Sequence, residues 1–386
     1  MPAPSAAELR REFLLDSEVA FLNHGSFGAC PRPVFERYQA WQRDLEREPV
    51  DFIARRLPDL LDEARSALAA YVGCPPMDLA FITNATTGVN LAARSLDFQP
   101  GDEVLATDLE YGACDLAWEW VCRRTGARYV RASIPLPIRD PGEVVEALFG
   151  AMSDRTRVVF VSHVTSKAGL VLPVEDIVAR ARALGLVTIV DGAHAPAHVP
   201  LDLTALGADF YSGNAHKWMC APKGAGFLHA PPEHQDRLDA AIVSWGYEEG
   251  NTFSERIEKQ GTRDPAAWLA VPDAIRFQAE REWGEVRDRC RGLAREARKQ
   301  LCDLLGTEPL TPDSMIAQMA AVRLPRSAPG LSDELFARHR VEIPVGGAER
   351  DVLRLSVAAY TTREEIDRLL AALARELDAE EGQQDE

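Results

Sequence analysis

Strand-like segments alternate with helical segments through the middle of the chain, and this alternation restricts the possible fold more than any other feature. Short apolar runs rich in β-branched and aromatic residues recur, and segments of helical period such as 174–184 lie between several of them. Such a pattern predicts an α/β fold with a mainly parallel sheet covered by helices on both faces. The expected strands are residues 79–83, 103–107, 128–132, 157–164, 186–191, 208–213 and 224–230.

The chain has 386 residues, which is enough for two domains. After about residue 265 the sequence changes to arginine-rich amphipathic helices, followed by a strand pair at 319–324 and 352–357 and a helix that begins with the capping box Thr362 and Glu365. We therefore expect a large domain at 51–264 and a smaller α+β C-terminal domain at 265–378. The N-terminal segment 1–50 is expected to join the small domain, and the acidic tail 379–386 to be disordered.

Composition excludes several classes of function. The formal net charge of −17 argues against a nucleic-acid surface. The seven cysteines form no CxxC pair, so neither a zinc site nor a disulfide framework is indicated, and we expect no metal. The N-terminus lacks the apolar core of a signal peptide, and the chain contains no uncharged span long enough to cross a bilayer. We expect a cytoplasmic protein without a nucleic-acid or membrane partner.

Asp191 and Lys217 form the most specific pair of residues. Asp191 ends an apolar run, and Lys217 follows in a loop of small residues. This is the order in which an enzyme dependent on pyridoxal 5′-phosphate (PLP) presents the carboxylate for the pyridine nitrogen and the amine that holds the aldehyde as a Schiff base. Only five of the 43 basic residues are lysines, so few others can serve. The alternative interpretation is an arginine-biased composition with leftover surface lysines.

A phosphate site is predicted where the sequence TNATTGVN (83–90) follows a strand and opens a helix. Free backbone N–H groups from Ala85 onwards and the hydroxyls of Thr86 and Thr87 suit the phosphate of PLP. Threonine-rich helix starts are more often simple caps, which is the alternative.

The whole run from Leu22 to Thr362 resembles fold-type I PLP enzymes of the class V aminotransferase family, which includes the cysteine desulfurases. The pattern around HKW (216–218) and APKG (221–224) carries this resemblance. Within the family the chain is most similar to the isopenicillin N epimerase branch, whose relatives include sulfoxide lyases and C–S lyases. The resemblance implies a large domain with a mainly parallel seven-stranded sheet and a smaller α+β C-terminal domain.

Site residues are carried over from the family by position. Tyr111 matches the aromatic residue that stacks on the ring, with cross-strand packing as the alternative, and His194 matches a partner of the ring hydroxyl. Ser166 lies where desulfurases have an asparagine near the same oxygen. The resemblance further implies phosphate contacts from Asn214 and His216, and from Thr262 of a neighbouring subunit, which makes the protein a homodimer with shared active sites.

The substrate side is also implied by the resemblance. Arg354 matches the arginine that binds the α-carboxylate of an amino acid, a task that suits its planar guanidinium; a solvated arginine at a strand edge is the alternative. The segment LNHGSFGACP (22–31) is similar to the substrate-side loop of the epimerase branch, so Asn23 and His24 are expected to contact substrate. The glycines and Ser26 of this loop could equally be turn residues.

The resemblance implies an enzyme that acts at Cα of an amino-acid or cysteine-conjugate substrate, with Lys217 as the base. We favour β-elimination from an S-substituted cysteine, because the branch contains such lyases and epimerisation needs a second base, for which His24 and Tyr111 are candidates. Epimerisation is the close alternative, followed by decarboxylating deamination and transamination. Persulfide chemistry is disfavoured because 337–353 contains no cysteine and Cys220 is expected to be a packing residue. A non-catalytic protein of this fold is disfavoured because Lys217 and Asp191 are both present.

Overall fold

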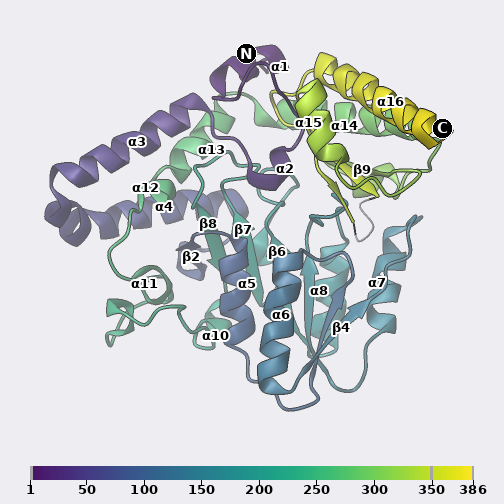
Figure 1. Cartoon of the computed structure of the whole chain (residues 1–386). Coiled ribbons are helices and arrows are strands. Elements are labelled where there is room, and N and C mark those ends of the chain that lie inside the picture. Colours follow the sequence, from purple (N-terminus) through teal and green to yellow (C-terminus); the bar gives the residue numbers. More distant parts are fainter. Residues whose placement is uncertain (1–2, 348–350, 385–386) are drawn as a thin grey trace.

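A seven-stranded sheet forms the centre of the larger part of the molecule (Figure 1), with strand order β2-β8-β7-β6-β5-β3-β4. The computed structural model describes residues 3–347 and 351–384, with side chains as far as Leu377. Neighbouring strands are parallel except at β8, which is antiparallel to both β2 and β7. All the expected strands are present: β2 (Leu79–Ile82), β3 (Glu103–Thr107), β4 (Arg128–Ala132), β5 (Thr156–Ser162), β6 (Val187–Gly192), β7 (Phe210–Asn214) and β8 (Gly226–His229).

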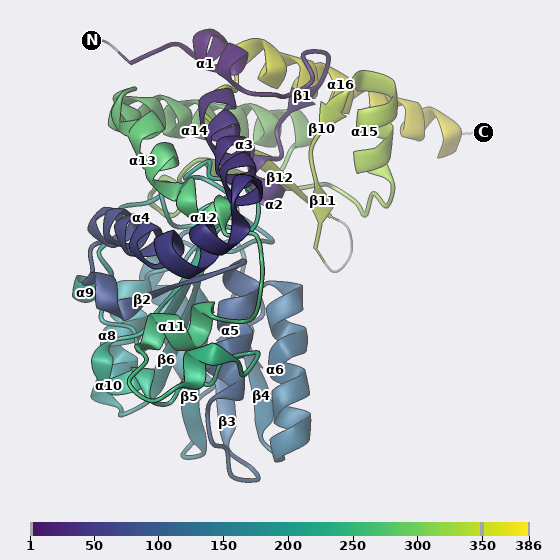
Figure 2. The ribbon, with the colours of Figure 1, turned by 90° about the vertical axis from the view of Figure 1, so that its left-hand side faces the viewer.

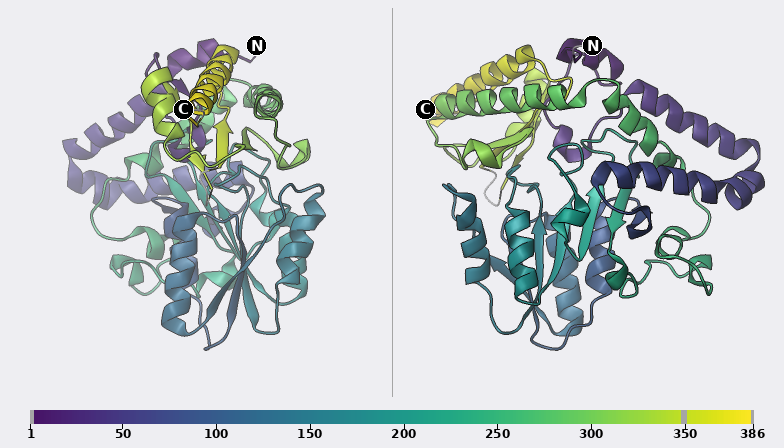
Figure 3. Two further views of the ribbon diagram at one scale, coloured as in Figure 1. Left: turned by 45° about the vertical axis from the view of Figure 1, so that its right-hand side comes forward. Right: turned by 180° about the vertical axis from the view of Figure 1, so that it is seen from behind.

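Each face of the sheet carries its own apolar layer, because successive strand residues point to opposite sides. In β5, Val158 and Phe160 belong to the layer that contains α5 and α6, whereas Val159 and Val161 belong to the layer that contains α7 and α8. Figure 3 shows the second of these layers from behind. The predicted α/β class is therefore confirmed. These helices are α5 (Ala85–Arg94), α6 (Gly112–Thr125), α7 (Pro141–Gly150) and α8 (Val174–Ala183).

A group of helices extends from one side of the sheet (Figure 2), where α3, α4, α12 and α13 lie together. Two short helices, α10 and α11, lie below this group. No helix in the described ranges combines the length and apolar character needed to span a membrane. The bounds are α3 (Arg32–Arg47), a π-helical turn (Asp51–Arg56), α4 (Leu57–Val72), α9 (Leu203–Leu206), α10 (Pro232–Gln235), α11 (Phe253–Glu258), α12 (Ala266–Leu269) and α13 (Val271–Ala279).

The C-terminal part forms a smaller lobe with a three-stranded antiparallel sheet of order β11-β12-β9. Strand β1 pairs in parallel with β10, so the start of the chain lies against this lobe. That pairing suits the division proposed from the sequence, whose boundaries stay a prediction. The elements are α1 (Ala6–Glu12), β1 (Ala20–Phe21), α2 (His24–Phe27), α14 (Trp283–Leu305), β9 (Met319–Arg323), α15 (Leu331–His339), β10 (Val341–Glu342), β11 (Val345–Gly346), β12 (Val352–Ser356) and α16 (Arg363–Gln384).

The last helix begins at the predicted capping box. The Glu365 N–H donates to Thr362 Oγ1 at 3.4 Å, and the Thr362 N–H donates to the Glu365 carboxylate at 2.9 Å. Helix α16 then continues to Gln384. The expectation of a disordered tail from residue 379 is thereby replaced by helix over most of its length, and its final two residues lie outside the described part.

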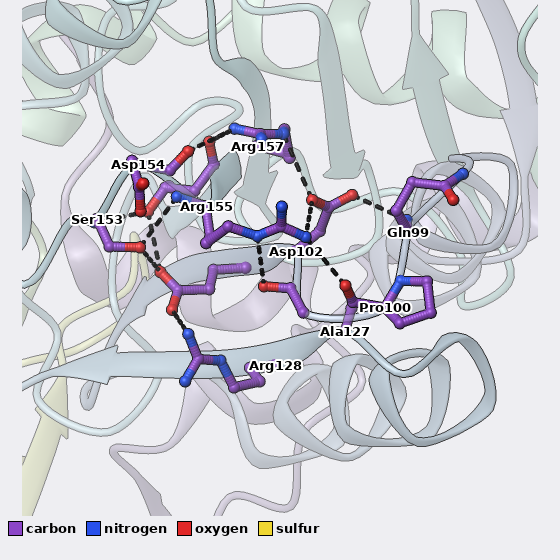
Figure 4. Close-up of polar contacts among 12 residues, drawn as sticks. Gln99, Pro100, Asp102, Ala127, Arg128, Ser153, Asp154, Arg155 and Arg157 are labelled. Atoms are coloured by element: carbon purple, nitrogen blue, oxygen red, sulfur yellow. Dashed lines mark hydrogen bonds and ion pairs between the residues drawn. The ribbon is translucent and has the colours of Figure 1, made fainter.

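Ion pairs connect the strands at the N-terminal edge of the sheet (Figure 4). Asp102 Oδ1 lies 3.3 Å from Arg155 Nη2 and 3.5 Å from Arg157 Nε, while Glu103 accepts from Arg128 on β4. The arginines are partly exposed, so each pair contributes only about 1 kcal/mol or less. The network fixes the loops of this edge, while the opposite edge carries the loops that leave the parallel strands.

Candidate active site

The loops that follow β3, β5, β6 and β7 emerge at one edge of the sheet. Strand order reverses between β3 and β5, and ligands of open α/β sheets bind at such a point. Asp191 is the penultimate residue of β6, Lys217 follows β7, and Tyr111 precedes α6 just after β3. The sequence separation of these residues is large, and the parallel strands bring them to the same edge.

Lys217 lies in a tight turn, with its carbonyl accepting from the N–H of Cys220 at 3.0 Å. Its Nζ is 3.1 Å from His194 Nε2. Desolvation by the surrounding protein lowers the pKa of Lys217 to about 8, although the charge of Asp191 acts in the opposite direction. A neutral amine is a nucleophile, and a pKa of about 8 leaves roughly a tenth of Lys217 neutral at pH 7, far more than for an ordinary lysine.

Asp191 is buried beneath this site. Its Oδ1 accepts from the backbone N–H of Ala193 at 2.9 Å, and its Oδ2 faces the Cys114 thiol at 3.6 Å. Burial raises the pKa of Asp191, while the Ala193 hydrogen bond and the charge of Lys217 lower it. A protonated pyridine nitrogen beside Oδ2 would offset the cost of burying this carboxylate.

Tyr111 and Cys114 belong to the same end of helix α6. Tyr111 is the N-cap residue, and its carbonyl accepts from the Cys114 N–H at 2.8 Å. Because Cys114 contacts Asp191, the first turn of α6 lies next to the carboxylate. The Tyr111 side chain is 43% exposed, which leaves its ring accessible for stacking against a flat ligand.

His194 contacts both Lys217 and the residue that follows it. Trp218 Nε1 is 3.5 Å from His194 Nδ1, on the other side of the imidazole from the Lys217 amine. Burial lowers the pKa of His194 far below its usual value, and the positive charges of Lys217 and Arg354 lower it further. The ring is therefore a neutral imidazole with defined neighbours at both nitrogens.

His24 contacts the turn that contains Lys217 from the other lobe. Its Nε2 is 3.0 Å from the Lys217 carbonyl, and its Nδ1 is 2.9 Å from the Tyr360 hydroxyl. Both ring nitrogens are thus engaged within the protein, and this arrangement positions Lys217. The expected contact with substrate stays untested, but this geometry offers no free nitrogen for it.

Arg354 lies on β12 with its guanidinium buried. Its Nη2 donates to Asn23 Oδ1 at 3.2 Å and to Ser26 Oγ at 2.9 Å, and its Nη1 donates to the Ser166 carbonyl. Within the described residues its buried Nε has no hydrogen-bond partner. Burial lowers the pKa of Arg354 to about 10, and no carboxylate among the described residues offsets that effect. A buried cation without an anion is a site for a carboxylate ligand.

The loop from residue 24 to residue 28 passes very close to the lysine turn. A Cβ on Gly28 would lie 2.0 Å from the His216 carbonyl oxygen and 2.8 Å from Lys217 Cα, and Gly28 has φ +70°. Only glycine fits both the contact and the backbone conformation. This loop is therefore more than a surface turn, because it holds the lysine in place.

The predicted phosphate end also forms one group. The Ala85 N–H donates to Asn214 Oδ1 at 2.8 Å, which ties the first turn of α5 to the lysine loop. The Thr87 N–H is capped by Asn84 Oδ1 at 2.9 Å, so the simple-cap interpretation is realised for this group. His216 Nδ1 donates to the Ala225 carbonyl at 3.1 Å. Phosphate binding by Thr86, Thr87 and His216 stays a prediction.

Thr262 lies away from these residues. With Gly261 it lines a surface cavity of about 1270 Å³ bordered by residues of α4 and α11, and none of the residues around Lys217 lines this cavity. Trp245, at its rim, is 73% exposed. Within one chain, the structure does not bring Thr262 to the site.

Several residues of the site escaped the sequence analysis. Cys114, Trp218 and Tyr360 are buried neighbours of Asp191, His194 and His24, and they carry no motif signal apart from the adjacency of Trp218 to the lysine. Asn84 was detectable as a helix N-cap. Cys220 packs as expected: it is 3% exposed, and burial raises the pKa of its thiol strongly.

The residues present fit PLP. The partly buried amine of Lys217, with its lowered pKa, suits the aldehyde, and the buried carboxylate near it suits the ring nitrogen. The helix N-terminus joined to the lysine loop suits the phosphate, and the half-exposed tyrosine suits the face of the ring. Among the described residues no group of three histidine, cysteine or acidic side chains is arranged to hold a metal ion.

Comparison with known sequences gives the same result. The sequence profile of the family described as aminotransferase class V matches residues 31–369. The chain is 44% identical to an isopenicillin N epimerase of Streptomyces clavuligerus over 95% of this chain and 97% of the relative, and 42% identical to one of Amycolatopsis lactamdurans over 97% and 99%. An L-cysteine desulfhydrase of Arabidopsis thaliana is 26% identical over 96% and 92%.

Solved structures share the fold. A cystine C–S lyase in complex with cysteine persulfide superposes with a TM-score of 0.80 at 23% identity, over 93% of this chain and 98% of the other. The cysteine desulfurase of Thermococcus onnurineus superposes with a TM-score of 0.82 at 20% identity, over 98% and 99%. At this level of identity the likeness establishes the fold-type I architecture, as predicted.

Proposed function

Since the chain belongs to the class V aminotransferase family of PLP-dependent enzymes, we propose that it is an amino-acid epimerase, which removes the α-proton of its substrate and returns a proton on the opposite face. The observation that carries this proposal is the 44% and 42% identity to two isopenicillin N epimerases over nearly the whole chain. This similarity reverses the order of preference from the sequence analysis, in which β-elimination came first.

PLP, when bound, supplies an electron-poor ring that accepts the electron pair left at Cα. In the proposal Lys217 holds the aldehyde carbon, Asp191 keeps the ring nitrogen protonated and Tyr111 covers one ring face. The remaining predicted contacts are His194 with Ser166 at the ring hydroxyl, and Ala85, Thr86, Thr87, Asn214 and His216 at the phosphate.

Arg354 is proposed to bind the substrate carboxylate. Its guanidinium is buried, and within the described part of the chain it has no carboxylate partner and its Nε is unpaired. Hydrogen bonds to Asn23, Ser26 and Ser166 fix the plane of the group. A carboxylate that accepts from Nε and displaces the Asn23 or Ser26 contact of Nη2 would receive two parallel hydrogen bonds. Such a pair would fix the orientation of the Cα bonds, which decides which bond breaks.

Two acid-base groups are required, one on each face of the substrate. Lys217 is proposed as the first, because its lowered pKa of about 8 lets the released amine accept a proton near neutral pH. His24 is not the second, because its ring nitrogens contact Tyr360 and the Lys217 carbonyl. Tyr111 is our candidate: it is half-exposed and begins the helix that reaches Asp191.

β-Elimination by a C–S lyase is the second candidate. The similarity to an L-cysteine desulfhydrase supports it, and the reaction needs no second base. A desulfurase-type persulfide is disfavoured, since 337–353 contains no cysteine and the Cys220 thiol is buried with a raised pKa.

The deciding experiment incubates the PLP-loaded protein in D₂O with isopenicillin N, and separately with L-cysteine and S-substituted cysteines. An epimerase yields both configurations with deuterium at Cα, whereas a lyase releases pyruvate with sulfide or thiol. Lys217→Ala is expected to abolish either reaction and the visible band of the bound cofactor. Tyr111→Phe should stop epimerisation and keep one-sided deuterium exchange; an unchanged epimerisation rate would exclude Tyr111 as the second base.

A homodimer with shared sites is also proposed. Its support is that Thr262 lines the cavity of about 1270 Å³, which neither Lys217 nor the residues around it line within one chain. The test mixes the inactive variants Lys217→Ala and Thr262→Ala under conditions of subunit exchange. If each site combines the two residues from different subunits, a mixed dimer contains one intact site and activity returns. No recovery despite subunit exchange would mean that one chain supplies both residues.

A further inference from the structure

The residue after the catalytic lysine is enclosed by two histidine rings. The Trp218 indole stacks almost parallel on His198, with ring centroids 4.1 Å apart and an interplanar angle of 10°, and lies 4.8 Å from the His24 ring. Trp218 is 3% exposed. Buried indole N–H groups usually find an acceptor, and the one that the structure gives Trp218 is His194 Nδ1 at 3.5 Å.

The hydrogen-bond partners of the two flanking histidines, His198 and His24, determine which ring nitrogen carries the proton. The Gln318 N–H donates to His198 Nε2 at 2.8 Å, so Nδ1 carries the proton and donates to the His194 carbonyl at 2.9 Å. His24 Nε2 faces the Lys217 carbonyl, which can only accept, so the His24 proton is on Nε2. Burial lowers the pKa of each of these two rings to about 3, which keeps them neutral.

The same reasoning determines which ring nitrogen of His194 carries the proton. An indole nitrogen donates and never accepts, so His194 Nδ1 must be the acceptor. A neutral imidazole then carries its proton on Nε2, which lies 3.1 Å from the Lys217 amine. We propose that Trp218 is a positioning residue whose indole N–H fixes the His194 proton on Nε2, so that His194 donates to Lys217 and favours its neutral, nucleophilic form.

The opposite tautomer would have the opposite effect. With its proton on Nδ1, His194 would present a lone pair to Lys217 and stabilise the ammonium form. The other groups that face Lys217 are Asp191 and the Cys114 thiol, which favour the charged amine, and Arg354, which disfavours it. The position of the His194 proton therefore decides whether its hydrogen bond lowers the pKa of Lys217, as burial does, or raises it.

The first test determines the tautomer directly. Side-chain ¹⁵N spectra of the PLP-loaded, full-length protein are expected to show His194 protonated on Nε2, with its signals assigned by their loss in His194→Gln. Trp218→Phe keeps an aromatic ring between the two histidines but removes the N–H, and is expected to shift His194 toward the Nδ1–H form. A wild-type His194 protonated on Nδ1 would overturn the proposal even if the Trp218 variant failed to fold.

The second test measures the pKa of Lys217. Competitive labelling of the cofactor-free, full-length chain with an amine reagent across a pH series gives the apparent pKa of Lys217 by peptide mass spectrometry. Trp218→Phe is expected to raise this pKa by about one unit, a roughly tenfold loss of neutral amine at a pH below it. Trp118→Phe is the matched control, because Trp118 is fully buried and its Nε1 has no partner among the described residues.

A double variant shows whether the effect passes through His194. In the His194→Gln background, Trp218→Phe should leave the Lys217 pKa unchanged. A shift of the same size in that background, or no shift in the single variant, would refute the role assigned to Trp218. The inference rests on the proposed role of Lys217 as the reactive amine and on no particular substrate, so loss of the epimerase assignment would leave these measurements intact.

Discussion

Replacing Glu110 by glutamine should raise the stability of the protein relative to the wild type, and this gain should be larger at alkaline pH than at acidic pH. Glu110 precedes Tyr111 and is fully buried. Its two oxygens accept from the hydroxyls of Thr107 and Ser162, each at 2.6 Å. Asp191 and Asp115 are its acidic neighbours. The site thus contains a second buried carboxyl group, to which the family resemblance assigned no role.

The size of this stability change follows from the pKa of Glu110. Burial raises the pKa of Glu110 from 4.5 to about 7, with smaller contributions from the two aspartates. The folded protein therefore keeps this proton to higher pH than the unfolded chain, so stability present below pH 4.5 is lost as pH rises through 7. At 1.36 kcal/mol per pKa unit the loss is about 3 kcal/mol. For a chain of this length that corresponds to about 3–4 °C in Tm.

Scanning calorimetry of wild type and Glu110→Gln at pH 5 and pH 8 tests this prediction. Glutamine copies the shape of the neutral acid and does not titrate, so its Tm relative to wild type should rise by those few degrees between the two pH values. Glu103→Gln, at the other end of β3, loses an ion pair with Arg128 and should show no such gain. Equal Tm differences at both pH values would refute a protonated Glu110.

Gly28→Ala should destabilise the protein and weaken PLP retention, measured by dialysis, whereas Gly250→Ala, with φ +88° and open space around it, should cost only the conformational strain of about 1 kcal/mol. Arg354→Lys should lower kcat/KM by about 10- to 100-fold, mainly through KM, because lysine cannot make paired hydrogen bonds to a carboxylate. The free energy of unfolding should fall as pH drops below 6.5, by about 1.4 kcal/mol per pH unit for each of His24 and His198. The reason is that these histidines bind protons in the unfolded chain but stay neutral when buried in the folded protein. Urea unfolding at pH 7, 6 and 5 measures this change, and a free energy of unfolding that does not vary with pH would contradict neutral buried rings.

The sequence alone determined the order of elements and the identity of the cofactor. Strand periodicity, helix caps and the Asp191–Lys217 pair depend on neighbouring residues and on chemistry that few side chains provide, so they are readable without coordinates. The seven strands and the capping box at Thr362 were confirmed for this reason. The helix that continues to Gln384 was missed, because an acidic composition indicated disorder more strongly than it indicated helix.

Tertiary structure alone decided which polar atoms remain available. His24 was a candidate for substrate binding by position, yet its nitrogens are engaged by Tyr360 and the Lys217 backbone. Cys114, Trp218 and Glu110 became part of the site only when parallel strands brought distant loops to one edge of the sheet. The physical reason is that desolvation and hydrogen-bond satisfaction are properties of the whole packed environment, and these set pKa values and proton positions that no local pattern encodes.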